Sequence, residues 1–380
     1  MTVGVRGAVG FVVVMAAWVL SVTLVAGQGA QAQKPQLSEQ VFKNVQVLRG
    51  ISADEFLGTM GVFSAALGVS CENCHGAETT WAGYAIDASA MKQTTRRMVI
   101  MMQAINQANF GGRQLVTCMT CHRGAQTPMS TPSLNVLYGQ PPPADDAEIF
   151  QQAPGAPTPD QVFDKYVAAL GGAQRINGFT SFVGKGQSLG YGPEGQRAFD
   201  VYAKAPGQRA IVFHTENGDT TYVYNGQTGI EASALGAVAL LEVTGQTLGG
   251  LKVETELLFP ARIKQLLTNP RVGFPAAIGD RDVVPVQGTA PGGGVVNLFF
   301  DAETGLLLRI LRFADSPVGR LSTKVDLDDY RDVSGIKFPF KQTLWRMNGK
   351  EEMEFTDVQV NANVDASRFA APKPSPRAGR

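Results

Sequence analysis

The order of apolar and polar residues predicts two helices in the first third of the chain. In the first helix, apolar side chains recur at the spacing i, i+4, i+7 and i+11, which places them on one face: Phe56, Met60, Phe63 and Leu67. Ser52 and Glu55 have the spacing of an N-terminal capping box, and Gly68 stands where a C-terminal cap is expected. We therefore expect a helix that begins after Ser52 and ends at Gly68.

A second helix is predicted between about residues 89 and 106. Four apolar residues share one stripe of this helix: Met91, Met98, Met102 and Ile105. Lys92 and Arg96 lie toward another face, and Gly111 with Gly112 ends the pattern. Each helix is followed, after a short connection, by a segment with two cysteines, so this part of the chain repeats one plan twice.

Beyond residue 126 the helical pattern is lost. Residues 127–157 are rich in proline, with three consecutive prolines at 141–143, and this composition favours an extended spacer between domains. Thr158, Pro159 and Gln161 then form a clear helix start.

Alternating runs follow this helix and predict strands, with one helix between Gly249 and Thr268. The predicted strands are 198–203, 210–213, 220–224, 295–300, 306–311, 340–347 and 350–358. Asn-Gly pairs at 217–218 and 348–349 mark tight hairpin turns. Residues 158–370 are therefore expected to form a mostly antiparallel β domain with one or two packed helices, followed by a disordered tail at 371–380.

Composition narrows the function classes. The 380 residues carry 33 Lys and Arg against 33 Asp and Glu, so the formal net charge is zero and no nucleic-acid partner is expected. With 44% hydrophobic residues, the chain can build more than one core.

The N-terminus has the features of an export signal. Arg6 precedes an apolar run from Ala8 to Ala26, and Ala30-Gln31-Ala32 offers a cleavage site. We expect residues 1–32 to be removed and the mature protein to be periplasmic. The apolar run approaches membrane-spanning length, so an uncleaved anchor that keeps the protein at the membrane is the alternative. The absence of a nearby cysteine argues against a lipid anchor.

The cysteines carry the strongest chemical signal. The sequences CENCH at 71–75 and CMTCH at 118–122 are both C-x-x-C-H units, the pattern of covalently attached c-type haem. In each unit two cysteines bind one porphyrin and the adjacent histidine ligates the iron. The expected attachment and ligand residues are Cys71, Cys74 and His75 for one haem, and Cys118, Cys121 and His122 for the other.

Two other interpretations use the same cysteines. Paired C-x-x-C units can hold a structural zinc ion, and they can form disulfides. A histidine directly after the second cysteine in both units favours haem, as does the use of all four cysteines of the chain in these units.

The distal ligand of each iron would be a histidine, a methionine or nothing. Met60 lies eleven residues before Cys71, and Met98 lies twenty residues before Cys118. By position alone, a methionine on an apolar helix face can equally fill a core. The second helix carries four methionines, so spacing does not select Met98 among them.

Three segments resemble the photosynthetic reaction-centre cytochrome c subunit family: FLGTMGVFSAALGVSC at 56–71, RRMVIM at 96–101 and VTCMTCHRG at 116–124. The resemblance covers about residues 40–126 and implies a small, mainly helical dihaem cytochrome domain at 33–126. In that family the methionines of the G-T-M-G and R-R-M sequences ligate iron. The resemblance thus implies Met60 and Met98 as distal ligands. It also implies an electron carrier whose partner is a periplasmic or membrane redox protein, such as a reaction centre or a quinol-oxidising complex.

The chain departs from that family in two respects. The well-known members carry four haems in two such repeats, whereas this chain has one repeat. They also place a histidine between the R-R-M helix and its haem, and residues 106–118 contain none. A stand-alone carrier is therefore expected, with the reaction centre as one option for its partner.

The second half of the chain offers weaker signals. The sequence DDYRDVSGIKFPF at 328–340, with the helix-then-strands order, resembles lipoprotein-carrier-like half-barrels of bacterial envelopes. His214 is expected to be a surface or edge residue, with a ligand or proton-relay role as the alternative. The acidic run at 326–329 is expected to be a solvated turn.

The complete prediction is an α+β protein: a dihaem domain followed by the β domain, acting as a carrier rather than an enzyme. Two six-coordinate haems would leave no open position for a substrate. The rival predictions are a peroxidase-like dihaem enzyme with one open site, and a haem-containing binding module whose β domain holds a lipid or a quinone.

Overall fold

The computed structural model describes residues 35–76, 81–87, 89–128, 130–131, 134–139, 151–190 and 195–373. The predicted signal peptide, part of the proline-rich segment and most of the C-terminal tail lie outside these residues. From Pro35 onward the chain groups into a single compact unit. The described part of the chain holds no helix with the length and apolar character needed to span a membrane.

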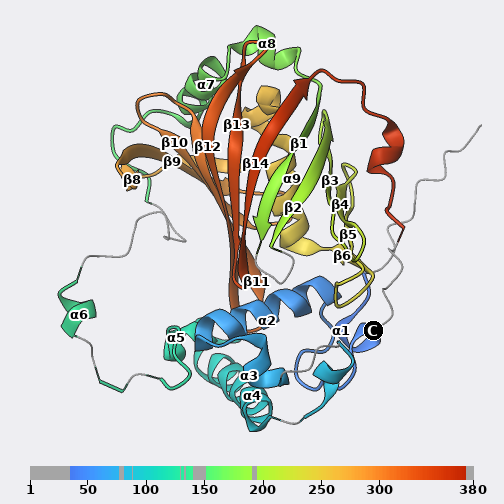
Figure 1. Ribbon diagram of the computed structural model, residues 1–380. Coiled ribbons are helices and arrows are strands. Elements are labelled where there is room, and N and C mark those ends of the chain that lie inside the picture. Colours follow the sequence, from blue (N-terminus) through green and yellow to red (C-terminus); the bar gives the residue numbers. More distant parts are fainter. Residues whose placement is uncertain are drawn as a thin grey trace, which may run out of the picture. The chain divides into compact units, whose positions relative to one another are not determined.

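Antiparallel strands build the larger part of this unit. Among the described residues, fourteen strands form one sheet in the order β6-β5-β4-β3-β2-β1-β14-β13-β12-β11-β10-β9-β7, with β8 paired to β9 (Figure 1). The strands are β1 Ser181–Gly190, β2 Gln196–Lys204, β3 Gln208–Phe213, β4 Thr220–Tyr224, β5 Gly229–Ala232, β6 Leu240–Val243, β7 Thr268–Val272, β8 Ala276–Ile278, β9 Arg281–Thr289, β10 Val295–Asp301, β11 Leu307–Ser316, β12 Gly319–Val333, β13 Ile336–Arg346 and β14 Gly349–Val360. Each predicted strand overlaps one of these. The pairing of β1 with β14 joins the first and last strands of the chain in the interior of the sheet.

Helices cover one face of this sheet. They are α7 Pro159–Ala169, α8 Ala173–Asn177, α9 Gly245–Glu256 and the 3₁₀ segment Pro260–Gln265. A further 3₁₀ turn, Ala366–Phe369, packs on the opposite face, where Phe369 clusters with Ala210 and Val223. Thr158 caps α7 with the predicted capping box. Phe163 of α7 packs edge-on against Phe300 of β10, at 5.9 Å between ring centroids, in the main hydrophobic core. The predicted α+β class with a mostly antiparallel sheet is confirmed.

The N-terminal part is helical. Its elements are α1 Ser38–Val41, α2 Ala53–Leu67, α3 Cys71–His75, the 3₁₀ turn Gly83–Ala85, α4 Ala90–Phe110, α5 Cys118–His122 and α6 Leu134–Leu137. Ser52 caps α2 as predicted, since its side chain accepts the N–H of Glu55, and Gly68 ends the helix in the left-handed conformation. The second long helix, α4, begins after Ser89 and continues to Phe110, one turn beyond the predicted end.

The helical part packs directly against the sheet. Helix α2 contacts β6, β11 and β12, and Figure 1 shows it running across the end of the sheet. At its N-terminus, Asp54 accepts both the backbone N–H (2.8 Å) and the hydroxyl (2.7 Å) of Thr244. No pattern in the sequence predicted these contacts, because they join residues almost two hundred positions apart.

Two sequence expectations about the β domain are wrong in detail. The acidic run 326–329 lies inside strand β12 and is not a turn. Asp326 stands directly opposite Arg309 of β11, whose Nε donates to it at 2.5 Å, and such opposed charges favour strand pairing. The predicted helix between Gly249 and Thr268 is instead two segments, because α9 ends at Glu256 and a 3₁₀ segment begins at Pro260.

The end of α2 makes a close approach that can be tested. Gly68 has a φ of 64°, and a Cβ atom at this position would lie 2.2 Å from the carbonyl oxygen of Gly124. The N–H of Gly124 donates to Ala66 at 2.9 Å, so this contact ties α2 to the chain just after α5. We expect Gly68→Ala to lower the free energy of unfolding by roughly 2–4 kcal/mol, since it adds left-handed strain and displaces backbone.

Gly111→Ala is the matched control for this measurement. Gly111 ends α4 with a φ of 62°, and a Cβ atom there would meet no other atom within 4 Å. This variant should lose only about 1 kcal/mol from backbone strain. If denaturant unfolding shows equal losses of free energy of unfolding for the two variants, the contact with Gly124 does not contribute to stability as expected.

Candidate haem-binding site

Both C-x-x-C-H units form single helical turns. Helix α3 follows Ser70, whose N–H donates to the side chain of Asn73 at 2.9 Å, and α5 follows Thr117, whose hydroxyl accepts the N–H of Thr120 at 3.4 Å. In a helix, residues three apart lie on the same side. The two cysteines of each unit therefore face one way, as attachment to a single porphyrin requires.

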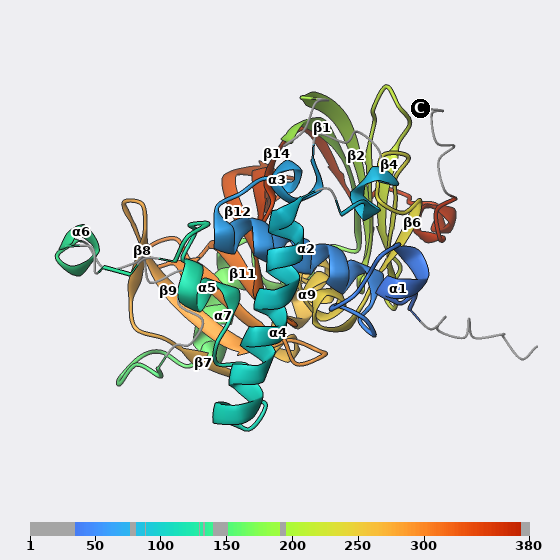
Figure 2. The same ribbon diagram turned by 90° about the horizontal axis from the view of Figure 1, so that it is seen from below.

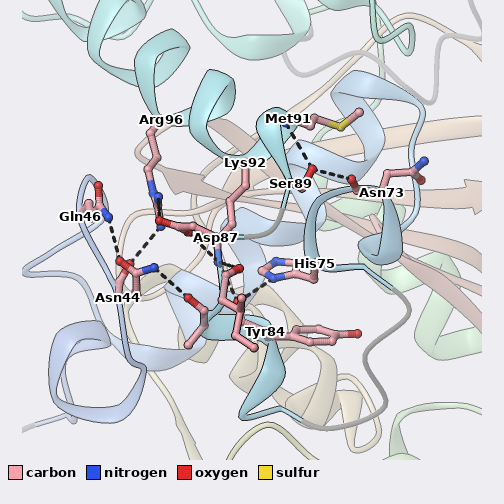
Figure 3. Close-up of polar contacts among 12 residues, drawn as sticks. Asn44, Gln46, Asn73, His75, Tyr84, Asp87, Ser89, Met91, Lys92 and Arg96 are labelled. Atoms are coloured by element: carbon pink, nitrogen blue, oxygen red, sulfur yellow. Dashed lines mark hydrogen bonds and ion pairs between the residues drawn. The ribbon is translucent and has the colours of Figure 1, made fainter.

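His75 is oriented by a backbone carbonyl. Its Nδ1 lies 2.9 Å from the carbonyl oxygen of Tyr84, and its ring stacks on the Tyr84 ring at 4.5 Å between centroids (Figure 3). A hydrogen bond at Nδ1 fixes the tautomer in which Nε2 carries a lone pair, which is how metal-binding histidines are usually held. Burial lowers the pKa of His75, and the charge of Lys92 acts in the same direction, so the neutral imidazole is favoured.

His122 has the same arrangement. Its Nδ1 lies 3.1 Å from the carbonyl oxygen of Ala125, three residues further along the chain. Both histidines thus use Nδ1 for a backbone carbonyl, and Nε2 of each is left for another partner. The segments after the two motif helices therefore orient the two imidazole rings in the same way.

A charged cluster holds the loop beneath His75. Asp87 binds Arg96 at 2.7 Å and Lys92 at 3.3 Å, and the hydrogen bond from Arg96 is the main reason that the pKa of Asp87 lies well below its usual range. Lys92 also donates to the carbonyl oxygen of Tyr84 at 2.8 Å. The same oxygen therefore serves both His75 and a cation, as Figure 3 shows.

The segment before the second unit is held by one buried side chain. Asn106, near the end of α4, donates to the carbonyl oxygen of Val116 at 2.7 Å and accepts the N–H of Val116 at 2.9 Å. Cys118 is held in a similar way. Its backbone N–H donates to the carbonyl oxygen of Val318 in the β11–β12 turn, at 3.1 Å. The sheet therefore helps to position the second unit.

The surroundings of the two units fit a covalently bound haem. None of the four cysteines forms a disulfide. Before any attachment, burial raises the pKa of the Cys118 thiol to about 11 and also raises that of Cys74. Large apolar side chains in and just before the second unit are exposed: Leu115 and Met119. An apolar macrocycle would cover such a surface, whereas a zinc ion or a disulfide would leave it open to water.

Within the described ranges, no three His, Cys, Asp or Glu side chains gather where they could hold a metal ion.

His214 lies apart from the two C-x-x-C-H units. It is partly exposed and lies between Asp200 (3.1 Å) and Asp219 (3.0 Å). Although partial burial opposes the charge, hydrogen bonds to these carboxylates raise the pKa of His214, so it acts as an ion-pair partner on the sheet.

The two proposed distal ligands lie on the long helices. Met60 is partly buried and packs against the cluster of Val62, Val99 and Met102, as Cys118 also does. Met98 is partly buried on α4. Helix α2 contacts α5, and α4 contacts α3, so the contacts run crosswise between the two repeats, as the view from below indicates (Figure 2). The assignment of each methionine to one of the irons therefore stays a prediction.

Sequence reasoning missed several residues that shape this site. Tyr84 and Ala125 contribute through backbone carbonyls, which leave no residue-type signal. The sequence placed Lys92 on a polar helix face. Its position one turn before Arg96 indicated that the two cations could bind the same carboxylate. Asp87 could have been found as the acidic residue that both bases can reach.

Comparison with known proteins confirms the resemblance seen in the sequence. The family described as the photosynthetic reaction centre cytochrome C subunit matches residues 14–145, which is less than half of the chain. The photosynthetic reaction center cytochrome c subunit of Roseobacter denitrificans is 33% identical over 100 residues, covering 24% of this chain and 27% of the relative. The subunit of Thermochromatium tepidum is 36% identical over 107 residues, covering 26% and 24%. The match thus spans about a quarter of each relative, and it identifies the segment with both C-x-x-C-H units as similar to c-type cytochrome subunits.

Solved structures also align with more than half of the chain, at low sequence identity. A LolA superfamily protein from Nitrosomonas europaea aligns with a TM-score of 0.39 and 12% identity, covering 57% of this chain and 99% of that one. A putative outer membrane lipoprotein-sorting protein domain from Vibrio parahaemolyticus gives a TM-score of 0.37 at 9% identity, covering 55% and 97%.

Proposed function

We propose that the chain is an exported electron carrier with two covalently bound c-type haems. One haem is attached through Cys71 and Cys74, and the other through Cys118 and Cys121. When bound, each haem supplies reversible one-electron chemistry at its iron. The observation that carries the proposal is the repeated geometry of His75 and His122, which both bind a backbone carbonyl through Nδ1 and present Nε2.

The residues of the chain hold and tune these groups. His75 and His122 are the proximal ligands in the proposal, and Met60 and Met98 are the distal ones. Thioether coordination favours a relatively high reduction potential. With both axial positions filled, no open site remains for a substrate, and a carrier is favoured over a peroxidase-like enzyme.

The proposed location is the periplasm, supported by the signal-like residues 1–32 and by the c-type haem motifs. The proposed partner is a periplasmic or membrane redox protein. A reaction centre is one option, supported by the names of the relatives. A quinol-oxidising complex is the other.

The test is a haem count together with a spectrum of the purified exported protein. A pyridine haemochrome assay should give two haems per chain, and the oxidised protein should be low-spin. A count of zero would contradict the cytochrome function. A high-spin haem that readily binds carbon monoxide would favour the enzyme alternative.

Lys92 offers a finer test of the first haem. We expect Lys92→Met to lower the reduction potential of one haem by on the order of 50 mV. The variant removes a positive charge near the iron, and it leaves the Tyr84 carbonyl free to draw more strongly on the Nδ1 proton of His75. Both changes stabilise the oxidised iron.

Lys341→Met removes a lysine that pairs with Glu354 on the exposed surface of the sheet, and it serves as the control. Its potentials in a spectroelectrochemical titration should equal those of the unchanged protein. A raised or unaltered potential in Lys92→Met would show that the Tyr84 carbonyl does not act on a haem ligand.

A further inference from the structure

The turn between strands β11 and β12 lies inside the helical part of the molecule, where β11 reaches helix α2 (Figure 1). Val318 in this turn is fully buried, although connections between strands usually lie at the protein surface. Its side chain belongs to the core cluster that contains Val62 of α2 and Val99 and Met102 of α4. One side chain from the sheet therefore lies in the core that the two long helices share.

The backbone of the same turn holds the segment that carries the second C-x-x-C-H unit. The carbonyl oxygen of Ser316 accepts a hydrogen bond from Nε2 of Gln114 at 2.9 Å. The carbonyl oxygen of Val318 accepts the backbone N–H of Cys118 at 3.1 Å. The first bond lies before the unit and the second lies at its first residue. The turn therefore fixes the start of the second unit through its backbone, while the Val318 side chain packs with the helices.

Internal hydrogen bonds give this turn a defined shape. The hydroxyl of Ser316 donates to the carbonyl oxygen of Gly319 at 2.6 Å and accepts the N–H of Val318 at 3.4 Å. A Cβ atom on Gly319 would lie 3.4 Å from Cγ1 of Val62, so little space is left between the turn and α2. Strands β11 and β12 are paired from this turn onward into the sheet. The turn is thus tied to the sheet and in close contact with the helical part.

The two methionines of the proposed function lie on the helices that share this core. Met60 of α2 packs against the cluster that contains Val318, and Met98 directly precedes Val99 on α4. Protein cores are close-packed, so a change in what fills this space moves the helices around it. The groups that surround metal ligands set the orientation of those ligands. The positions of both methionines therefore depend on the packing of Val318.

We propose that Val318 is a positioning residue for the haem ligands, and that the β domain is the fixed support of the electron-transfer site. The inference rests on the proposed function and adds to it a role for the second half of the chain. Val318 acts through Cys118 and the two long helices. A supported ligand geometry keeps the thioether groups in place when the iron changes its oxidation state, and this favours a high reduction potential.

Val318→Ala in the full-length exported protein tests the positioning role. It removes both γ-methyl groups from the shared core and keeps the backbone bond to Cys118. Val286→Ala is the matched control, because Val286 is also fully buried but lies in β9 within the main core of the sheet. The two truncations weaken stability by the same cavity effect. Only Val318→Ala should weaken a sulfur-to-iron charge-transfer band and lower the potential of at least one haem. Bands and potentials equal to those of Val286→Ala would overturn the proposal.

Amide hydrogen exchange at Cys118 gives a second readout that does not depend on haem. The N–H of Cys118 is bound to the turn, so a turn that packs less firmly should release it more often. We expect exchange in Val318→Ala to be at least about tenfold faster than in Val286→Ala. Equal exchange rates would refute the support of the second unit by the turn. A haem count of zero in the unchanged protein would contradict the proposed function instead, so the two failures are distinguishable.

Ser316→Ala covers the case in which Val318→Ala fails to fold. It removes the hydroxyl that closes the turn and leaves the side chains of the shared core in place. Exchange at Cys118 should again be faster, and the same potential should fall by a smaller amount. Ser188→Ala is its control, because Ser188 is a buried serine of β1. If Ser316→Ala matches Ser188→Ala in both measurements, the turn does not position the haem ligands.

Discussion

Cys71→Ser is expected to remove stable attachment of one haem, and Cys118→Ser that of the other. Each serine has the size of the thiol it replaces but forms no thioether bond to the porphyrin. A unit with a single thiol lacks one of the two bonds that attachment requires, so we expect its haem not to be retained covalently. Denaturing mass spectrometry of the exported protein should show one haem fewer in each variant, and two fewer when both are combined.

The sheet should survive both changes. The anchoring of Cys118 to the β11–β12 turn uses its backbone N–H, which serine retains. Met119→Leu is the control inside the second unit, because Met119 is 53% exposed and stands at a position that the porphyrin bonds do not use. It should keep both haems. Two haems in Cys71→Ser would instead mean that covalent attachment at 71–75 does not depend on its first cysteine.

Local signals in the sequence were sufficient where a short stretch determines its own structure. Ser52 and Gly68 define α2 because an N-cap and a left-handed C-cap act within one helical turn. The Asn-Gly pairs at 217–218 and 348–349 lie in turns between paired strands for the same reason. The C-x-x-C-H spacing likewise predicts both attachment sites without any knowledge of the fold.

Features that depend on distant residues were not predictable. The acidic run 326–329 looks like a turn until Arg309 is placed opposite Asp326, and that register is set by the whole sheet. The packing of α2 on the sheet depends on contacts such as that of Asp54 with Thr244.

The carbonyl partners of the two histidines belong to the same class. Nothing in the residue types of Tyr84 and Ala125 marks their backbone oxygens as acceptors. Their positions follow from where the described segments 81–87 and 123–125 lie relative to the motif helices. The sequence predicts His75 and His122 as ligands, but it does not indicate which groups orient them.

Experiments on the methionines can test whether the distal ligands implied by the family resemblance apply to this chain. Met102 is 4% exposed and sits in the core with Val62 and Val99, so it fills space. Met101 is 46% exposed on the opposite side of α4 from that core. Met60 and Met98 are partly buried, so each keeps accessible surface that a haem could contact.

Met60→Leu is therefore expected to abolish the weak sulfur-to-iron charge-transfer band of one oxidised haem and to lower the potential of that haem. The exchange conserves side-chain volume, so the free energy of unfolding should fall by less than about 1.5 kcal/mol. Met98→Leu should have the same effect on the other haem. Met101→Leu and Met102→Leu are the controls on the same helix, and both should keep the two bands.

The crosswise contacts of the helices make the identity of each affected haem informative. Met60→Leu combined with Cys118→Ser leaves only the haem at His75 covalently attached. If Met60 serves that iron, the remaining band disappears. If Met60 reaches across to His122, the band of the His75 haem persists, in agreement with the contact between α2 and α5. Loss of a band in Met101→Leu or Met102→Leu, with Met98→Leu silent, would show that the family ligand at this position does not carry over. Spectra unchanged by all four substitutions would mean that neither iron is bound by these methionines, and the enzyme alternative would gain support.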